Sequence, residues 1–158
     1  MAERSPGDAG PRPQASPAGT VGYLVWRAHL VVRRLLDEAL AELGVTAAHV
    51  GIAAELIGRG PCAVSDLARA IGMTAQGATR TARQLRELGW VVPAESPGQG
   101  RAILLEITGE GREGYRKAVH IMEQVDASMT AGIPAAERER ARAVLAVIAG
   151  TGGRGPEF

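Results

Sequence analysis

Between residues 74 and 89, polar side chains recur at a spacing that places them on one side of a helix. Stepping about 100° per residue brings together Gln76, Arg80, Arg83 and Glu87, with Thr79 at their edge. A glutamine amide can form two hydrogen bonds with adenine, an arginine guanidinium can form two with guanine, and a helix has the right width for the major groove of DNA. These residue types and this spacing therefore predict hydrogen bonding to the edges of bases.

The remaining residues of this segment favour the same interpretation. Gly77 carries no side chain, so the backbone could approach a phosphate near the helix N-terminus, where anions are favoured. Three arginines and one glutamate give residues 74 to 89 a charge of +2, although the net charge of the whole chain is only +1. The opposite side of the helix is small or apolar and could lie close to a supporting helix; it consists of Ala78, Ala82, Leu85 and Gly89.

Arginines on an exposed helix also have a plainer interpretation, because such faces are usually just solvated. Arg86 lies off the centre of the polar side, and we expect it to pair with a neighbour or to reach a phosphate. Residue type alone weighs the two interpretations about equally. The segments around this helix are needed to distinguish base recognition from a solvated helix face.

The neighbouring segments form a supersecondary pattern that does so. We expect Ser65 to cap a short helix through Ile71, Gly72 to make a tight turn, and Thr74 to open the longer helix, which ends at Gly89. The strand-like runs "WVVPA" and "RAILLEIT" are joined by "ESPGQG", whose proline and two glycines predict a hairpin tip. This order is that of a winged helix-turn-helix. The side chains that would brace the longer helix are Leu67, Ala68 and Ile71.

The rest of the chain is predicted to be helical. Thr46 and Thr108 can cap helices, Pro134 suits the first turn of a last helix, and "CAV" is a candidate minor strand. The fold class is therefore mainly α with a small β-hairpin, in one compact domain with tails. The predicted organisation is a disordered arm at 1–19, a domain at 20–150 with its winged helix-turn-helix at about 46–108 and outer helices at about 20–43 and 109–150, and a disordered tail at 151–158.

A family resemblance rests on "SDLARAIGMTAQGATRTARQLRELGWV" and on "RAILLEITGEG", which closes the hairpin. The pattern "LxxxGWV", then a hairpin and "LxxTGEG", resembles the MarR-type (multiple antibiotic resistance regulator) bacterial transcription factors, and the resemblance covers about residues 20–150. It implies a dimeric DNA-binding repressor or activator. It also implies that the first and last helices form the dimer interface.

The resemblance assigns DNA contacts residue by residue, and we add the predicted caps Ser65 and Thr74 to that set. The family wing typically carries an Asp-Arg pair where this chain has Gln99 and Gly100. This wing therefore lacks one cation and the carboxylate that would orient it. Its remaining arginine, Arg101, could enter the minor groove from a more flexible tip or only touch a phosphate. The contacts implied by the resemblance fall on Gln76, Gly77, Thr79, Arg80 and Arg83 in the recognition helix and on Arg101 in the wing.

The outer helices carry more apolar surface than one small winged domain can cover, which predicts a homodimer. Two recognition helices would then lie about 10 bp apart on a palindrome of double-stranded DNA. The resemblance also implies a small aromatic or anionic effector in the cleft beside the dimer helices, near Trp26, His29 and His49. We interpret Trp26 as a core residue and the histidines as ordinary residues, as is His120, so no ligand residue is assigned.

Other functional classes find little support in the sequence. No spacing predicts a metal or cofactor site or a catalytic group, so we do not expect an enzyme. The single cysteine, Cys62, excludes an intramolecular disulfide, and it could be an oxidant sensor but is more typical of an inert, partly buried residue. We expect a cytoplasmic protein with no membrane partner. The competing hypothesis is a winged-helix module for protein interaction, which the altered wing favours.

Overall fold

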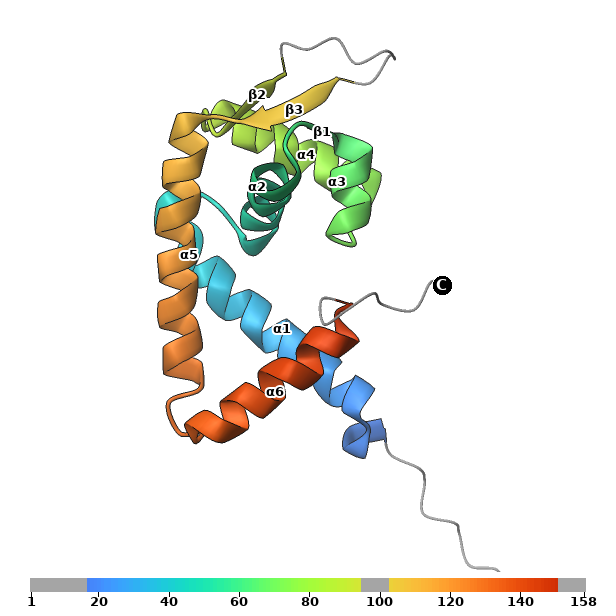
Figure 1. The fold of residues 1–158 in the computed structure, drawn as a ribbon, viewed down its shortest axis with the longest axis vertical. Helices are drawn as coiled ribbons and strands as arrows, with labels where there is room; N and C mark the ends of the chain where they lie inside the picture. The colour runs from blue at the N-terminus through green and yellow to red at the C-terminus, as the bar shows by residue number, and fades with distance from the viewer. Residues whose placement is uncertain (1–16, 95–102, 151–158) are drawn as a thin grey trace, which may run out of the picture. The chain divides into compact units, whose positions relative to one another are not determined.

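The computed structural model describes residues 17–94 and 103–150. The chain is mainly helical with one small sheet, as predicted (Figure 1). Two short 3₁₀ turns flank the first helix at Pro17–Gly19 and Ala41–Leu43. The helices and strands are α1 (Val21–Leu40), α2 (Ala47–Arg59), β1 (Cys62–Ala63), α3 (Val64–Ala70), α4 (Ala75–Glu87), β2 (Val91–Pro93), β3 (Leu104–Ile107), α5 (Gly109–Met129) and α6 (Ala135–Ile148).

The chain divides into two compact units, Met1–Arg34 and Leu35–Phe158. The first contains the N-terminal part of α1, where the rings of Tyr23 and Trp26 lie 5.6 Å apart. Trp26 is 54% exposed, so its interpretation as a core residue is wrong for the single chain. An apolar stripe on a helix is buried only if something packs against it, and sequence periodicity does not say whether that partner lies in the same chain.

The second unit is built around α2, which packs against α3, α4, α5 and β3. α5 begins beside the sheet and runs away from it (Figure 1). Burying these apolar side chains removes them from water, and this is the main term that holds the unit together. The largest fully buried side chains are Leu40, Ile52, Leu56, Leu67, Leu85 and Val91.

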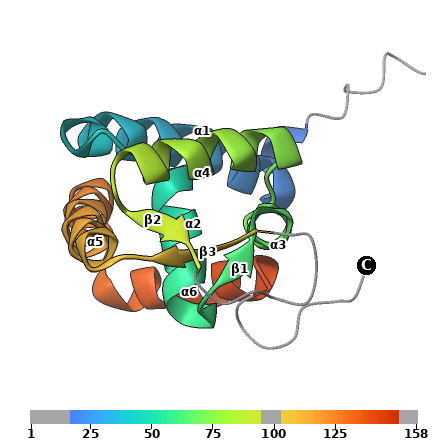
Figure 2. The same ribbon diagram turned by 90° about the horizontal axis from the view of Figure 1, so that it is seen from above.

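The sheet is antiparallel in the order β1-β3-β2, and Figure 2 shows it from above. The predicted hairpin is present as β2 and β3, with Val91 opposite Ile107. The candidate strand at "CAV" joins it as a third strand, with Cys62 opposite Leu105. Pro93 lies on an edge strand, where its missing N–H is tolerated. The predicted hairpin tip at 95–102 lies outside the described residues.

Most predicted helix starts are confirmed. Thr46 occupies the N-cap of α2, and the hydroxyl oxygens of Thr74 and Thr108 accept the backbone N–H groups of Gly77 and Gly111 at 3.1 and 2.9 Å. The prediction for the short helix is wrong, because α3 begins one residue before Ser65 and its N-cap is Ala63. Ala63 also pairs with β3, so the strand fixes where the helix starts and overrides the local preference for a serine cap.

Among the described residues, no single helix is long and apolar enough to cross a membrane. One bent pair, residues 21–43 with α2, meets the length and composition requirement only when its two helices are taken together.

Candidate nucleic-acid interface

The inner face of α4 holds this helix against α2 and α3. Ala78, Ala82 and Leu85 are 0%, 3% and 0% exposed, as the helical spacing predicts. The bracing role predicted for Leu67 and Ala68 agrees with their burial and with the packing of α3 on α4. The small alanine side chains let α4 lie close to its supports.

Thr81 is buried on the same face, and the helical spacing did not identify it. Its hydroxyl donates to the carbonyl oxygen of Gly77 at 3.0 Å, so its one polar group is satisfied inside the helix. A threonine can therefore lie on a buried helix face without an external partner.

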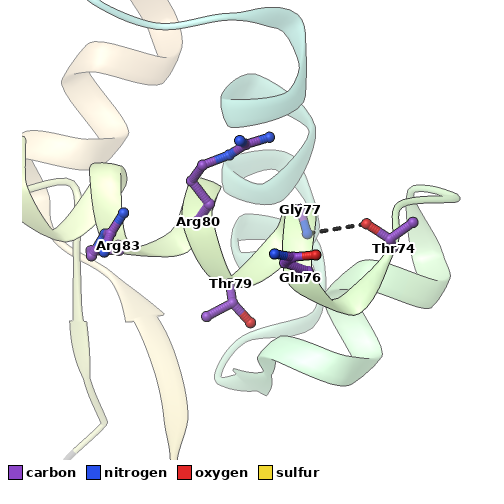
Figure 3. A pocket seen from close by; sticks show the side chains of 6 residues that line it. All are labelled: Thr74, Gln76, Gly77, Thr79, Arg80 and Arg83. Atoms are coloured by element: carbon purple, nitrogen blue, oxygen red, sulfur yellow. Dashed lines mark hydrogen bonds between the residues drawn. The ribbon is translucent and has the colours of Figure 1, made fainter.

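The outer face of α4 is an open, shallow groove of about 590 Å³ (Figure 3). Its polar groups come from both the start and the middle of the helix. Six of the eight residues that we assigned to DNA binding line it together: Thr74, Gln76, Gly77, Thr79, Arg80 and Arg83. Ser65 is exposed on α3 and does not line this groove, and Arg101 lies outside the described residues.

Contacts within α4 and its N-cap restrict what Thr79 and Gly77 can offer to a binding partner. The hydroxyl of Thr79 donates to the carbonyl oxygen of Ala75 at 2.8 Å, so it keeps acceptor lone pairs and a methyl group for a partner. A Cβ added at Gly77 would lie 3.1 Å from Thr74 Oγ1 and 3.3 Å from Met73 Cε. The glycine therefore makes room for the cap of its own helix as well as for an approaching molecule.

The guanidinium groups of the groove are held weakly or not at all. Within the described parts of the chain Arg80 makes no ion pair. Arg83 Nε lies 3.9 Å from Glu87 Oε1, and the two side chains are 71% and 68% exposed. Such an exposed pair contributes about 0.3–0.5 kcal/mol at most. Both arginines are therefore available to an anionic or hydrogen-bonding partner.

Arg86 lies aside from this groove, in a second hollow of about 470 Å³ between the end of α4 and β2. It is exposed, and among the residues described it has no ion-pair partner. Of the two roles expected for Arg86, an ion pair with a neighbour is not found among the described residues. Contact with a phosphate stays a prediction for this residue.

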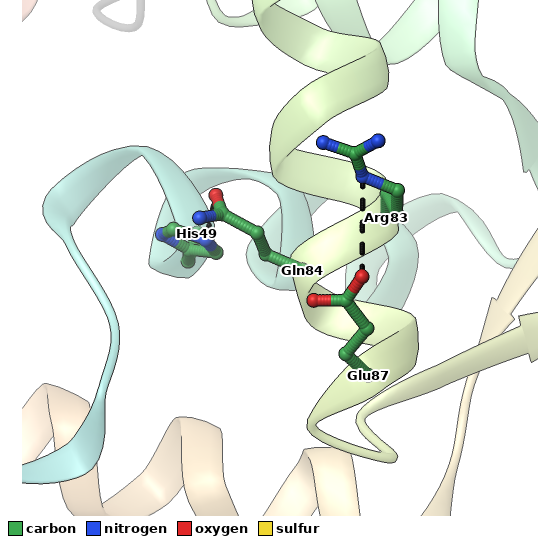
Figure 4. A network of polar contacts seen from close by, with 4 residues as sticks. All are labelled: His49, Arg83, Gln84 and Glu87. Carbon is green, nitrogen blue, oxygen red and sulfur yellow. Dashed lines mark hydrogen bonds and ion pairs between the residues drawn. The ribbon is translucent and has the colours of Figure 1, made fainter.

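A buried histidine connects α2 to α4 (Figure 4). His49 is 5% exposed, and its Nε2 lies 3.1 Å from Gln84 Oε1. Its Nδ1 lies 3.1 Å from the backbone nitrogen of Thr46 and 2.8 Å from Thr46 Oγ1. The contact between Thr46 and His49 could have been found from their spacing in the sequence. They occupy the N-cap and third positions of a helix, where each side chain often accepts the backbone N–H of the other residue.

Burial lowers the pKa of His49, and the hydrogen bond to Gln84 and the carboxylate of Asp37 oppose this shift. Asp37 lies at the same end of α2, where its Oδ1 accepts the backbone N–H of Ala47 at 3.0 Å. His49 is therefore neutral at neutral pH, and the first turn of α2 is tied both to α1 and to α4.

The residues considered for an effector cleft belong to both units of the chain. His49 is buried against α4, whereas Trp26 and His29 are exposed in the first unit. A mainly apolar groove of about 520 Å³ lies elsewhere, between α2 and α5. Its lining is Ala47, Val50, Gly51, Ala54, Tyr115, Val119, Met122, Glu123 and Asp126.

Two other candidate sites can be placed. Cys62 is a free, partly buried thiol in β1, as expected of an inert cysteine. The described residues contain no group of three or more metal-ligating side chains. His120 is exposed on α5, where its Nε2 lies 3.1 Å from Gln124 Nε2.

Comparison with known proteins shows which family this arrangement resembles. The sequence model of the MarR family matches residues 43–102, which include α2, α3, α4 and β2. Over these residues the chain is similar to the MarR family. It is 26% identical over 126 residues to the HTH-type transcriptional repressor Rv2887 of Mycobacterium tuberculosis, a match that covers 79% of this chain and 90% of that protein.

Solved structures of MarR-family proteins share the fold. A MarR-family regulator from Rhodococcus sp. RHA1 has a TM-score of 0.76 at 22% identity, over 87% of this chain and 96% of that one. Rv2887 in complex with salicylic acid has a TM-score of 0.69 at 26% identity, and the match covers 80% of this chain and 94% of that one. A mutant MarR from E. coli, complexed with operator DNA, has a TM-score of 0.69 at 21% identity, over 81% and 92%.

Proposed function

We propose that this MarR-like protein is a homodimeric, sequence-specific repressor of transcription that binds palindromic operator DNA through α4. The observation that carries the proposal is the outer face of α4, where an amide, a hydroxyl and two weakly held guanidiniums line one open groove. The relative Rv2887, which is a transcriptional repressor, supports repression over activation. A target in genomic DNA implies a cytoplasmic location.

The groove divides into two kinds of contact. Gln76, Arg80 and Arg83 reach base edges in the major groove, because amide and guanidinium groups can make paired hydrogen bonds there. The backbone at Thr74 and Gly77 faces a phosphate at the positive end of the helix. Together these contacts would give both register and sequence preference.

Two further residues, one on α3 and one outside the described part of the chain, are proposed to contact the DNA backbone or the minor groove. Ser65 is exposed in the first turn of α3 and would donate to a phosphate. Arg101 belongs to the wing, next to Gln99 and Gly100, and is proposed to touch the minor groove or a phosphate. Neither contact would carry the sequence preference that we assign to α4.

A dimer would cover apolar side chains that the single chain leaves in water. On α6 these are Val144, Leu145, Val147 and Ile148, which are 56%, 49%, 65% and 52% exposed. In the first unit, Leu24, Leu30 and Val31 on α1 are also exposed. Exposed apolar patches on a folded chain are typical of interaction surfaces. We therefore assign α1 and the last two helices to the dimer interface, in a domain at 20–150 whose winged helix-turn-helix spans about 46–108.

We further propose that a small aromatic or anionic compound releases the protein from DNA. The structures of Rv2887 with salicylic acid and with p-aminosalicylic acid support this class of effector. The groove between α2 and α5 offers apolar contacts to an aromatic ring, whereas its carboxylates, Glu123 and Asp126, would repel an anion at their end. A bound anion would therefore turn its charge away from these two residues.

The alternative is a winged-helix module that binds another protein. The observation that favours it is the altered wing, where Gln99 and Gly100 supply neither the cation nor the carboxylate of the family pattern. Such a module would show weak binding to all duplexes and no preference among them.

Selection of bound duplexes from a random pool, with the purified full chain, tests the proposed function. A palindromic consensus with half-sites about 10 bp apart is expected, because a two-fold dimer places its recognition helices about one DNA turn apart. Recovery of no enriched sequence at low salt would contradict specific DNA binding and favour the protein-interaction module.

A further inference from the structure

The hydrogen bond between His49 and Gln84 joins two residues that are 35 positions apart in the sequence. His49 is the third residue of α2, and Gln84 lies in the C-terminal half of α4, next to Arg83. Figure 4 shows His49 and Gln84 facing each other, while Arg83 and Glu87 lie along another side of α4. The contact therefore reaches α4 without using the groups of its outer face.

The partners of His49 define which ring nitrogen carries the proton. The backbone N–H of Thr46 can only donate, so Nδ1 must be the acceptor in that hydrogen bond. In a neutral ring the proton is then on Nε2, which donates to Gln84 Oε1. The hydroxyl of Thr46 can turn its hydrogen toward Nδ1. All of these contacts agree with one neutral tautomer.

The apolar contacts of α4 constrain its rotation about its own axis only loosely. Its buried inner face is made largely of Ala78, Ala82 and Leu85. Apolar burial has no preferred direction, and two alanines offer little shape to resist a rotation of the helix about its axis. A hydrogen bond weakens steeply when its angle departs from linearity. The bond from His49 to Gln84 can therefore define a rotation that the apolar contacts alone would define loosely.

We propose that His49 and Gln84 are positioning residues for DNA reading: their hydrogen bond sets the rotation of α4 on α2 and so the direction in which Arg80 and Arg83 point. The inference rests on the proposed DNA-binding function. Paired hydrogen bonds to a base need distances of about 2.7–3.2 Å and nearly straight angles. Losing the bond therefore weakens sequence reading more than it weakens general attraction to phosphates.

The first test replaces Gln84 by methionine, which keeps the length of the side chain and removes its acceptor. The control is Glu55→Gln, because Glu55 also holds a side-chain partner, Arg59, but within the single helix α2. The probes are the duplex that the wild-type chain selects from a random pool and a shuffled duplex of the same composition. Affinities for both are measured across a salt series.

For Gln84→Met we expect the ratio of the two affinities to fall roughly 5- to 100-fold, which corresponds to the discrimination of one base-reading pair. The salt dependence should stay unchanged, because the number of phosphate contacts is the same. The control should keep the wild-type ratio. An unchanged ratio in Gln84→Met would overturn the proposal.

Gln84→Glu separates positioning from a merely structural role. Its carboxylate still accepts the hydrogen of His49 Nε2, so the affinity ratio should return toward the wild-type value. The added negative charge should lower the affinity for both duplexes together. A ratio as low as that of Gln84→Met would contradict the inference.

NMR measurements without DNA test the positioning of α4 independently of the proposed DNA-binding function. Nitrogen NMR of the histidine rings should find the proton of His49 on Nε2, and residual dipolar couplings of the α4 amides should change in Gln84→Met but not in Glu55→Gln. If the wild-type chain selects no duplex, the proposed function fails while these couplings still test the positioning. If the residual dipolar couplings of α4 are unchanged in Gln84→Met, the proposed positioning role is contradicted.

Discussion

The two faces of α4 differ in how their side chains are held. On the inner face, Ala78 and Leu85 are fully buried, and their positions follow from the packing of the unit. On the outer face, Arg80 and Arg83 have at most one distant ion pair among the described residues, and their removal would leave the core intact. The stability of the fold and the proposed reading of DNA thus depend on different residues of one helix.

Substitutions on the two faces should therefore have different effects. A change on the inner face should lower the free energy of unfolding and affect DNA binding only through the folded fraction. A change on the outer face should lower affinity for DNA at constant stability. Thr74 and the contact of His49 with Gln84 lie between these extremes, because they tie the position of the outer face to the fold.

The largest effect is expected for Leu85→Ala. Leu85 is 0% exposed and belongs to the main apolar core. Its truncation should lower the free energy of unfolding by about 2–5 kcal/mol, because it removes buried methyl groups and leaves a cavity. Urea denaturation followed by circular dichroism measures this. A loss below about 1 kcal/mol would show that the inner face is not the support of α4.

Arg83→Ala should act on the other face. We expect the affinity for the selected duplex to fall by ~1–3 kcal/mol, with a relaxed preference at one base position and an unchanged melting temperature. Fluorescence anisotropy measures the affinity. Arg59→Ala is the control, because Arg59 also pairs with a glutamate four residues away, Glu55, but on α2. Equal losses in the two variants would remove the special role of the outer face.

Thr74→Ala should have a mixed effect. Its hydroxyl oxygen caps α4 by accepting the N–H of Gly77, and loss of such a cap lowers stability by about 1 kcal/mol. The first turn of α4 should also fray, which hydrogen exchange of its amides would reveal. Thr74→Ser keeps the cap and should behave like the wild type. If the serine variant frays as the alanine variant does, the cap is not what holds this turn.

The smallest effect is expected from the titration of His49. Because burial lowers its pKa in the folded state below the usual 6.5, the unfolded chain binds this proton at a higher pH than the folded chain does. The contribution of His49 is therefore complete above pH 6.5 and is lost as the pH falls from there through the lowered pKa. The groups that face the ring from other elements are the carboxylate of Asp37 and the neutral amide of Gln84.

Unfolding curves of the wild type and of His49→Gln between pH 5 and 7.5 measure this contribution. The wild type should lose more stability than the variant as the pH falls through this range, because the glutamine does not titrate. Parallel curves for the two chains would contradict the lowered pKa of His49.

Much of this arrangement was predictable from the sequence, because it depends on local periodicity. The 3.6-residue repeat identified the buried Ala78, Ala82 and Leu85, and threonines marked the starts of α4 and α5. Features set by distant contacts were not predictable. Pairing of β1 with β3 moved the start of α3 away from Ser65, and no periodicity connects His49 to a residue 35 positions away.

The most direct test of the proposed function is the affinity of the full wild-type chain for its selected duplex and for a shuffled duplex between 50 and 200 mM salt. A DNA reader should bind the selected duplex at least about 10³-fold more tightly, and both affinities should fall steeply as salt rises. Equal affinities for the two duplexes, or no detectable binding to either at low salt, would contradict sequence-specific reading by α4.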